Sequence, residues 1–438
     1  MSISRYLLFF CGQVGMMSLA RFFFQWIAKF TTGSEGSPEL LSGLAVGIIL
    51  LGFRIFDGIT DPIAGRLSDA WTRTGRARQQ LLWVSLLLPG SGLVITFLPN
   101  EAMPVTLRWF CVATGMFIFF VGYTFYAIPY WSLVGDYSNG DPQRRRVLSN
   151  LLGGGMVVAT GIGFVVSGGV IKALGYVPAA AIFALAGAIL MAMPYFAAPA
   201  DCKPKKSSPG RKPEIPFWQS VKLALNHRRF LALIALFAGS QMSFTIMTAA
   251  SPFIAVDLLG GDKSDIARVM GPLLATAVPF FFLVPTVSRR MGWLKGMLYA
   301  SLGLAVIYSL SGFLGNAVIG NPFTTASLLF ALGGPMVALL LGLEAEGIVD
   351  CAEERGGGDR IGIYWGVFNF VVKILNGFAL LAAMILASMA KGDAWGNTPV
   401  RTMSFTAGGC LLGGMLCYFL ISPLPRKTGK DNDCLTEH

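Results

Sequence analysis

Charged residues are scarce in this chain. Only 13% of its 438 residues are Asp, Glu, Lys or Arg, whereas 54% are hydrophobic. A water-soluble domain carries about a quarter charged residues, so this composition excludes a surface that faces water on all sides. Histidine is nearly missing, with only His227 and His438, and no CxxC motif occurs. These absences argue against a zinc or haem site and against histidine-based catalysis.

Long apolar runs are present instead. Runs of about 18 or more apolar residues are long enough to cross a bilayer as helices, and backbone groups in lipid must be paired internally. The sequence therefore predicts an all-α integral membrane protein with twelve transmembrane helices. The predicted spans are 6–30, 41–66, 80–98, 107–134, 148–172, 178–197, 230–256, 268–288, 296–316, 324–345, 362–389 and 401–422.

Basic residues are distributed unevenly between the predicted loops. Most of the 34 Lys and Arg residues fall at the termini or in loops after even-numbered spans, such as 73–78, 144–146 and 203–212. An excess of this kind marks the cytoplasmic side of a membrane. We therefore expect a protein of the inner or plasma membrane with both termini in the cytoplasm. The net charge of +11 is then explained by the basic residues of the cytoplasmic loops, and no nucleic acid partner is expected.

A polar segment divides the chain in two. Residues 198–229 are rich in Pro, Ser, Lys and Arg in their first part, as in an exposed linker. The predicted organisation is a six-helix half over 1–197, a cytoplasmic linker over 198–229, a second six-helix half over 230–422 and a tail over 423–438. Two pseudo-symmetric halves that enclose a central site are a common plan of membrane transporters.

Three charged side chains lie inside the second predicted span. Arg54, Asp57 and Asp61 are three and four residues apart and therefore share one helical face. A charge at the bilayer centre costs about 2.5–3.5 kcal/mol, so this face must point to the bundle interior. One excess negative charge remains, which a proton or a monovalent cation can neutralise. The alternative is a structural ion pair with the other carboxylate snorkelling to the interface.

Other polar residues in predicted spans are candidates for the same interior. Lys373 lies deep in span 362–389 and could compete with a cation for the aspartates, or it could snorkel. Arg21 shares a face with Gln13, or reaches the outer interface. Aromatic residues with polar groups suit a substrate cavity, although each could equally be a packing residue. The aromatic residues in question are Tyr123, Phe125, Tyr126, Tyr130, Trp131, Trp365 and Phe368.

Three segments together resemble a known family. "RIFDGITDPIAG", "IPYWSLVGD" and "DRIGIYWGVFNFVVK" are similar to signatures of the glycoside–pentoside–hexuronide:cation symporters, the melibiose-permease-like members of the major facilitator superfamily. The resemblance implies that Asp57 and Asp61 form the cation site and that Lys373 takes part in coupling. It also implies that Trp131 lies at the substrate site.

The resemblance further suggests a cytoplasmic gate. In such a gate, basic residues of one half meet acidic residues of the other, and solvated loop charges are the alternative. The candidate gate residues are Arg144, Arg145, Arg146, Asp350, Glu354 and Arg360.

Two positions depart from the family pattern. The sugar-carrying members have aspartates where this chain has Gln13 and Ala127. Polar recognition would then fall to the uncharged and basic residues of the cavity, which favours an anionic, zwitterionic or lipid-like solute over a galactoside. The candidate substrate-binding residues are Gln13, Arg21, Tyr123, Tyr126, Trp131, Trp365 and Asn369.

The expected function is cation-coupled symport of a small organic solute, sugar-like or anionic or zwitterionic, by alternating access. A lysophospholipid transporter of the same family is the alternative. A polytopic enzyme or a sensor is remote, because the chain offers no catalytic constellation. We expect no enzyme activity and no cofactor. The transported cation would be Na⁺ or H⁺, and no metal is expected beyond a transported Na⁺. The protein is expected to be a monomer in a lipid bilayer.

Overall fold

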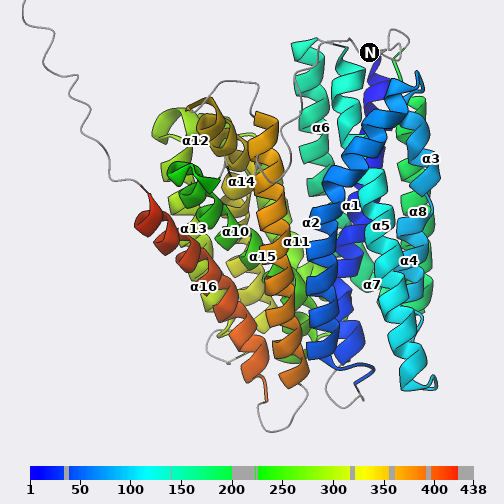
Figure 1. Cartoon of the computed structure of the whole chain (residues 1–438). Coiled ribbons are helices and arrows are strands. Elements are labelled where there is room, and N and C mark those ends of the chain that lie inside the picture. The colour runs from blue at the N-terminus through cyan, green and yellow to red at the C-terminus, as the bar shows by residue number, and fades with distance from the viewer. Residues whose placement is uncertain are drawn as a thin grey trace, which may run out of the picture.

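The protein is a bundle of long helices (Figure 1). The computed structural model describes residues 1–33, 39–139, 141–199, 222, 225–315, 321–354, 361–390 and 396–422. Within these ranges every regular element is helical and no strand occurs. Helices satisfy their own backbone groups, which is what apolar segments in a membrane require. The predicted all-α class is therefore confirmed.

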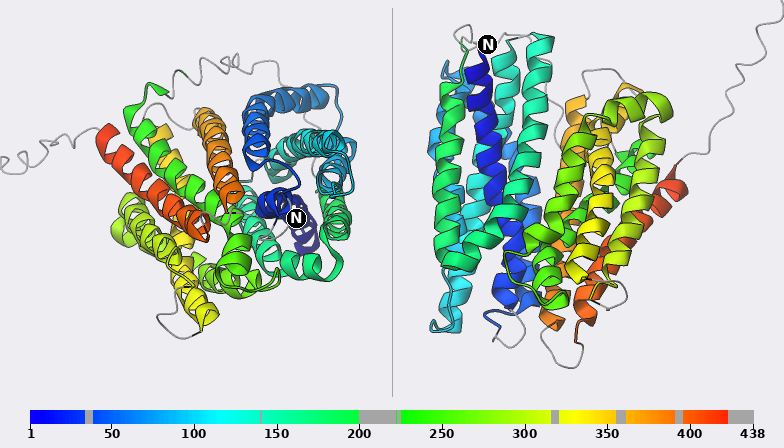
Figure 2. Two further views of the ribbon diagram at one scale, coloured as in Figure 1. Left: turned by 90° about the horizontal axis from the view of Figure 1, so that it is seen from below. Right: turned by 180° about the vertical axis from the view of Figure 1, so that it is seen from behind.

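The helices of residues 3–196 lie on one side of the molecule, and those of residues 228–421 lie on the other (Figures 1 and 2). We call them the N-terminal group and the C-terminal group. The N-terminal group contains α1 (Ile3–Thr32), α2 (Gly43–Arg73), η1 (Arg78–Gln80), α3 (Leu81–Ser85), α4 (Leu88–Thr96), α5 (Val105–Ser138), α6 (Pro142–Gly161), η2 (Ile162–Val166), α7 (Ser167–Leu174) and α8 (Tyr176–Phe196). The C-terminal group contains α10 (Arg228–Phe253), η3 (Ile254–Leu258), α11 (Ile266–Phe281), α12 (Val284–Met291), α13 (Trp293–Ser311), α14 (Pro322–Glu354), α15 (Ile361–Met389) and α16 (Thr398–Ile421).

Most predicted spans correspond to a continuous helical segment, but the eighth does not. Eleven segments of the described chain are long and apolar enough to cross a membrane, or twelve if the bent pair α11 and α12 is one span. The sequence predicted an unbroken span over 268–288, whereas the axis bends by 62° between α11 and α12. Pro279 lies inside α11, and Pro285 lies in the first turn of α12. Proline removes a helical hydrogen bond and clashes with the preceding turn, which accounts for the break.

The two groups approach each other closely along α2 and α15. A Cβ atom on Gly58 would lie 3.1 Å from the ring of Phe370, and one on Gly377 would lie 3.0 Å from Cβ of Arg54. Near the other end of the same contact, a Cβ atom on Gly43 would lie 2.6 Å from the carbonyl oxygen of Met384. Small residues permit this approach between membrane helices, and it brings the polar residues of α2 within reach of α15.

Ion pairs join the two groups at the end of the molecule away from the N-terminus. Lys29 at the end of α1 pairs with Asp257 in η3, and the Lys29 side chain is fully buried. Lys172 of α7 pairs with Asp262 at 2.5 Å in a more exposed position. We call this the lower end, as it is drawn in Figure 1. Hydrogen bonds from Lys172 and Ser264 hold the pKa of Asp262, which lies in the loop before α11, well below its usual range.

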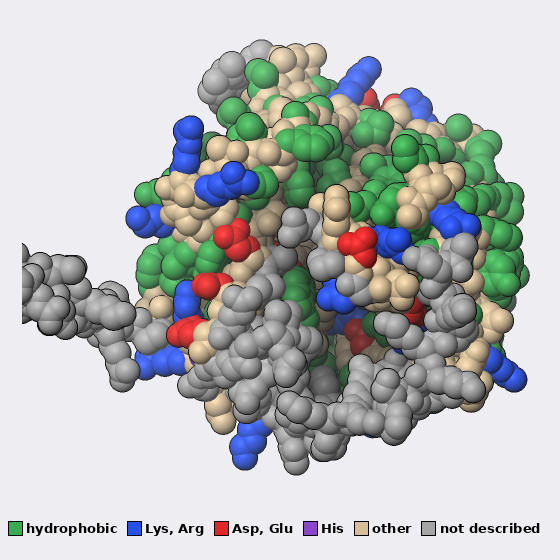
Figure 3. Space-filling model, turned by 90° about the horizontal axis from the view of Figure 1, so that it is seen from above, with side chains coloured by type: hydrophobic (Ala, Val, Ile, Leu, Met, Phe, Trp, Pro, Cys, Tyr) green, Lys and Arg blue, Asp and Glu red, His purple; other side chains and the backbone are tan. Residues whose placement is uncertain are grey.

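The opposite end, which we call the upper end, carries many basic side chains around its rim (Figure 3). Positive charge predicts that this end faces the cytoplasm. Among the described residues, its charged pairs stay within one group. Arg78 binds Asp136 in the N-terminal group, whereas Arg229 binds Asp350 and Glu354 in the C-terminal group. Among the residues whose side chains the structure describes, the ion pairs that link the two groups therefore lie at the lower end and near the middle.

The close approach of α4 and α5 gives a stability prediction. A Cβ atom on Gly92 would lie 2.3 Å from the backbone nitrogen of Phe119, so Gly92→Ala must push the two helices apart. We expect a loss of about 1–3 kcal/mol, seen as a lower thermal midpoint in detergent. Gly52→Ala is the control, because nothing lies within 4 Å of that position. An equal response of the two variants would contradict the described packing.

Candidate functional site

The charged residues predicted on α2 lie together, and Lys373 of α15 joins them. The Lys373 ammonium is 2.5 Å from Oδ2 of Asp61 and 3.1 Å from Oδ2 of Asp57. Arg54 also approaches Asp57, with Nη1 3.3 Å from the same Oδ2 atom. The Asp57 side chain has no exposed surface, and that of Asp61 is 20% exposed. We call these four residues the charged cluster.

Thr124 of α5 completes the surroundings of Asp57. Its hydroxyl donates to Oδ1 of Asp57 at 2.5 Å, so both carboxylate oxygens of Asp57 are engaged. Thr124 is not among the residues predicted from the sequence. Its only signal was its place one residue after Tyr123, in the aromatic run of the same predicted span.

Backbone oxygen is also available between the two aspartates. Pro62 follows Asp61 inside α2 and has no N–H, so the carbonyl of Gly58 has no helical donor four residues ahead. Asp61 is bound through Oδ2 alone among the residues that the structure describes. Free carbonyls and carboxylate oxygens are the groups that hold small cations in membrane transporters. Asp57, Asp61, Thr124 and the Gly58 carbonyl are therefore the candidate cation ligands.

The charge balance of the cluster includes Lys373. The sequence left one excess negative charge on α2, with Lys373 as a competitor for it. In this structure Lys373 contacts both carboxylates, so two cations and two anions balance. The Lys373 ammonium thus occupies the position next to both aspartates that a bound cation would need.

Aromatic rings surround the outer side of Arg54. Its guanidinium carbon lies 4.5 Å from the ring centre of Phe24 and 5.9 Å from that of Phe120. Such cation–π contacts stabilise a cation that is removed from water. Arg54 is thereby held within the N-terminal group, whereas Lys373 belongs to the other group and can move with it.

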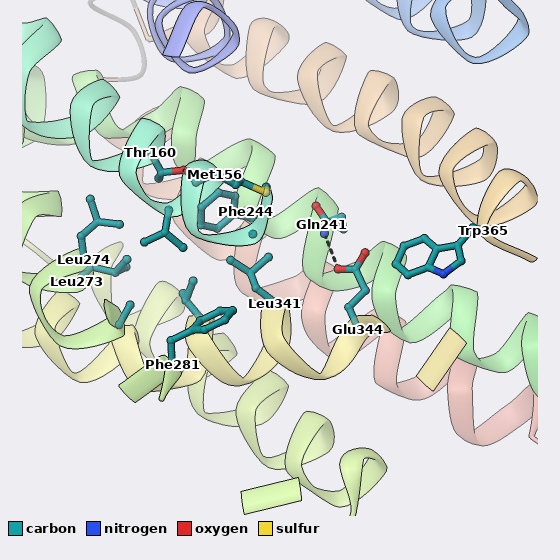
Figure 4. A pocket seen from close by; sticks show the side chains of 14 residues that line it. Met156, Thr160, Gln241, Phe244, Leu273, Leu274, Phe281, Leu341, Glu344 and Trp365 are labelled. Atoms are coloured by element: carbon teal, nitrogen blue, oxygen red, sulfur yellow. Dashed lines mark hydrogen bonds between the residues drawn. The ribbon is translucent and has the colours of Figure 1, made fainter. Parts of the chain in front are cut away.

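A cavity of about 200 Å³ lies between the two groups (Figure 4). Its wall in the N-terminal group comes from α6, and the opposite wall comes from α10, α11, α14 and α15. The residues that line it are Gly153, Met156, Val157, Thr160, Gln241, Phe244, Leu273, Leu274, Ala277, Phe281, Val337, Leu341, Glu344 and Trp365. Trp365, a predicted substrate residue, lies beside Glu344 (Figure 4).

The other predicted substrate residues are spread over several environments. Gln13 accepts a hydrogen bond from the Trp131 indole at 3.1 Å, which joins α1 to α5. Tyr123 donates to the sulfur of Met17 at 3.6 Å. Tyr126 is fully buried and donates to the carbonyl of Met191 at 2.6 Å, so it packs inside the N-terminal group. Asn369 is exposed on α15.

Arg21 connects α1 to the wall of the cavity. Its guanidinium carbon lies 5.2 Å from the ring centre of Phe244, which is a lining residue. Arg21 forms no salt bridge within the part of the chain that the structure describes. Its positive charge is therefore balanced by no neighbouring carboxylate there.

The described contacts of the predicted gate residues lie within their own groups. Asp350 and Glu354 bind Arg229 of their own group at 2.7 and 2.6 Å. Arg144 donates to the carbonyl of Tyr137 at 3.3 Å, and Arg145 is exposed. Arg146 lies on α6, and Arg360 lies outside the described residues. A gate between Arg144–Arg146 and the two acids stays a prediction for another conformation.

Comparisons with known proteins place the chain in a family. A family model described as "MFS/sugar transport protein" matches residues 8–428. The chain is 25% identical over 360 residues to YagG of Escherichia coli (strain K12), a proposed glycoside/cation symporter; the match covers 79% of this chain and 74% of that protein.

Solved structures show the same fold. The nucleoside transporter NupG superposes with a TM-score of 0.65 at 14% identity, over 96% of this chain and 99% of that one. A structure from a study of substrate recognition in proton-dependent oligopeptide transporters also gives a TM-score of 0.65, at 10% identity, over 96% and 98% of the two chains. The expected major facilitator fold is thereby confirmed. The chain belongs to the MFS/sugar transport protein family, and it is a membrane transporter and not an enzyme.

Proposed function

We propose that this protein is a cation-coupled symporter for a small organic solute and works by alternating access. The observation that carries the proposal is the charged cluster, in which Lys373 of one group bridges two carboxylates of the other. The similarity to YagG, a proposed glycoside/cation symporter, supports the same function. Na⁺ and H⁺ are both candidates for the cation.

Coupling follows from competition for Asp57 and Asp61. Two carboxylates in a site of low dielectric need positive charge beside them. Either Lys373 or a bound cation can supply it, and the two repel each other at such a short distance. Entry of the cation therefore favours a state in which Lys373 has moved away from the aspartates. Release of the cation favours the state described here, in which Lys373 contacts them. Because Lys373 lies on the opposite group, replacing it with a bound cation at the aspartates changes how the two groups are arranged.

Alternating access requires that the two ends close in turn. The ion pairs Lys29–Asp257 and Lys172–Asp262 join the two groups at the lower end, and the buried Lys29–Asp257 pair is the one that holds this end closed. At the upper end, the acids Asp350 and Glu354 are occupied by Arg229 of their own group. With the upper end in the cytoplasm, as positive charge predicts, this arrangement corresponds to a state that is closed to the outside.

A small soluble solute fits the comparisons better than a lipid. The matching family model is named for sugar transport, and none of the relatives described above is a lipid carrier. The lysophospholipid alternative thus gains no support. The cavity is small, since drug-sized ligands occupy about 300–1,000 Å³. We therefore retain a sugar-like, anionic or zwitterionic small molecule as the transported solute.

Coupling can be tested with purified protein in proteoliposomes. We expect labelled glycosides, pentosides or hexuronides to accumulate when an inward gradient of Na⁺ or H⁺ is imposed. Asp57→Asn and Asp61→Asn should abolish accumulation against a gradient, because each removes a carboxylate that would hold the cation. Asp141→Asn is the control: Asp141 is the exposed N-cap of α6, and asparagine caps equally well. Accumulation by both α2 variants at the wild-type level would contradict the proposal.

Competition by Lys373 gives a second prediction. Lys373→Gln leaves the two aspartates with one unbalanced negative charge, so a cation should bind more tightly while transport slows. We expect the Na⁺ concentration at half-maximal thermal stabilisation to fall about tenfold or more, which corresponds to about 1.4 kcal/mol. A parallel titration with pH in choline buffer tests H⁺ instead. Weaker binding of both cations by the variant would mean that Lys373 only orients the aspartates.

The lower-end pairs give a third prediction. Removing one partner of a buried ion pair costs about 3–5 kcal/mol, enough to shift a two-state equilibrium strongly. Lys29→Gln should therefore open the lower end, seen as a longer distance between spin labels at Leu174 and Phe313, two exposed positions. The double variant Lys29→Asp/Asp257→Lys should restore the short distance.

Lys172→Gln is the matched control, because the Lys172–Asp262 pair is exposed and such pairs contribute about 0–1 kcal/mol. An unchanged label distance in Lys29→Gln would show that the buried pair does not hold the lower end closed.

A further inference from the structure

One half-buried carboxylate has no part in the charged cluster. Glu344 of α14 lines the cavity between the two groups, and its Oε2 accepts a hydrogen bond from Nε2 of Gln241 on α10 at 2.9 Å (Figure 4). No Lys or Arg is among the lining residues that the structure describes. A carboxylate that faces a membrane cavity and is held by a neutral amide still requires hydrogen-bond donors or a positive charge.

The polar groups of the cavity are mainly acceptors. Gln241 gives one amide N–H to Glu344 and retains its second N–H and its carbonyl oxygen, and Glu344 retains Oε1. The Thr160 hydroxyl donates to the carbonyl of Met156 at 2.8 Å, so only its lone pairs remain. A ligand that satisfies these atoms must bring several donors and at least one acceptor, as a molecule with multiple hydroxyl groups does.

Aromatic surface lies next to these acceptors. The Trp365 indole stands beside Glu344, and Phe244 lies one turn after Gln241 on α10 (Figure 4). The remaining wall is apolar and includes Met156 and Leu341. A flat apolar face beside hydroxyl groups matches this combination, since a small site fixes its ligand with few polar groups and packs the rest on apolar side chains.

Positive charge near the cavity argues against an organic cation. Arg21 lies over Phe244 without a salt-bridge partner among the described residues. Lys373 follows Trp365 by eight residues on α15, about 12 Å along the helix. A free anion would in turn face the Glu344 carboxylate at close range. A neutral solute avoids both repulsions.

We propose that Glu344 and Gln241 form a solute subsite that binds the hydroxyl groups of a small neutral ring, such as a monosaccharide or its glycoside, with the ring against Trp365. This inference rests on the proposed function and narrows its solute class. In the N-terminal group, Gln13 and Trp131 bond to each other, whereas Glu344 of α14 is the carboxylate among the lining residues that the structure describes. The subsite faces α6 across the cavity, and a bound ring would contact both groups.

The test is ligand binding to the purified full-length protein. Three matched classes of probe are compared by thermal shift and titration: neutral hexoses, pentoses and their glycosides; the corresponding uronates; and amino sugars. We expect neutral sugars to stabilise the wild type more than either charged class. Glu344→Gln should raise their Kd by about 10- to 100-fold, the range for a lost hydrogen bond to a charged acceptor.

Glu346→Gln is the matched control, because Glu346 lies two residues away on α14 and binds Ser288 in an exposed position. It should keep the wild-type Kd. Gln241→Met, which removes the amide without adding charge, should weaken neutral sugars in the same direction as Glu344→Gln. The thermal midpoints of all variants without ligand show that they are folded.

Several results would overturn the subsite: neutral sugars bound equally by Glu344→Gln and wild type, stronger stabilisation by uronates or amino sugars, or no stabilisation by any probe. Retained sugar binding with an altered pH dependence of uptake would assign Glu344 to proton movement instead. If the subsite proposal fails, cation-driven uptake should still depend on Asp57 and Asp61. Failure of the symport proposal would leave sugar binding dependent on Glu344, so the two can be told apart.

Discussion

The contact between Lys373 and the two aspartates of α2 is the interaction on which the rest of the structure depends. It balances charge in a region where unpaired charge is costly, and it does so across the boundary between the two groups of helices. Arg54 cannot replace it, since it is held inside the N-terminal group by Phe24 and Phe120. Asp57 therefore contacts one cation that is fixed in its own group, Arg54, and both aspartates contact Lys373, which moves with the opposite group. A transported cation that replaces Lys373 can thus change how the two groups are arranged.

The helix packing makes that contact possible. Gly58 and Gly377 let α2 and α15 approach until Lys373 reaches Asp57 and Asp61, and Pro62 leaves a carbonyl without a helical donor between them. Ion pairs join the two groups at the lower end, while the described ion pairs of the upper end, such as Arg229 with Glu354, lie within one group. The cavity with Glu344 and Trp365 lies between these groups. A solute in this cavity and a cation at the charged cluster would both contact the interface between the two groups of helices.

Much of this was predictable from the sequence, and the reasons for the rest are physical. Apolar run length predicted the spans, and the cost of intramembrane charge singled out Arg54, Asp57, Asp61 and Lys373. The sequence offered Lys373 as a competitor for the two aspartates, with snorkelling as the alternative, but the choice between them depends on how two distant helices meet. It missed Thr124 and Glu344, since a threonine is unremarkable in a span and Glu344 falls at the end of the predicted span 324–345. The break between α11 and α12 was signalled by Pro279 and Pro285, but apolar length alone extended the span through it.

The most direct measurement is the charge movement that follows a rapid rise in cation concentration, recorded on proteoliposomes adsorbed to a solid-supported membrane and without any solute. Cation entry at the charged cluster moves charge part of the way across the membrane. We predict a transient current on a Na⁺ or H⁺ jump in the wild type and its loss in the double variant Asp57→Asn/Asp61→Asn. An undiminished current in the double variant, or no current with either cation in the wild type, would contradict a cation site at these aspartates.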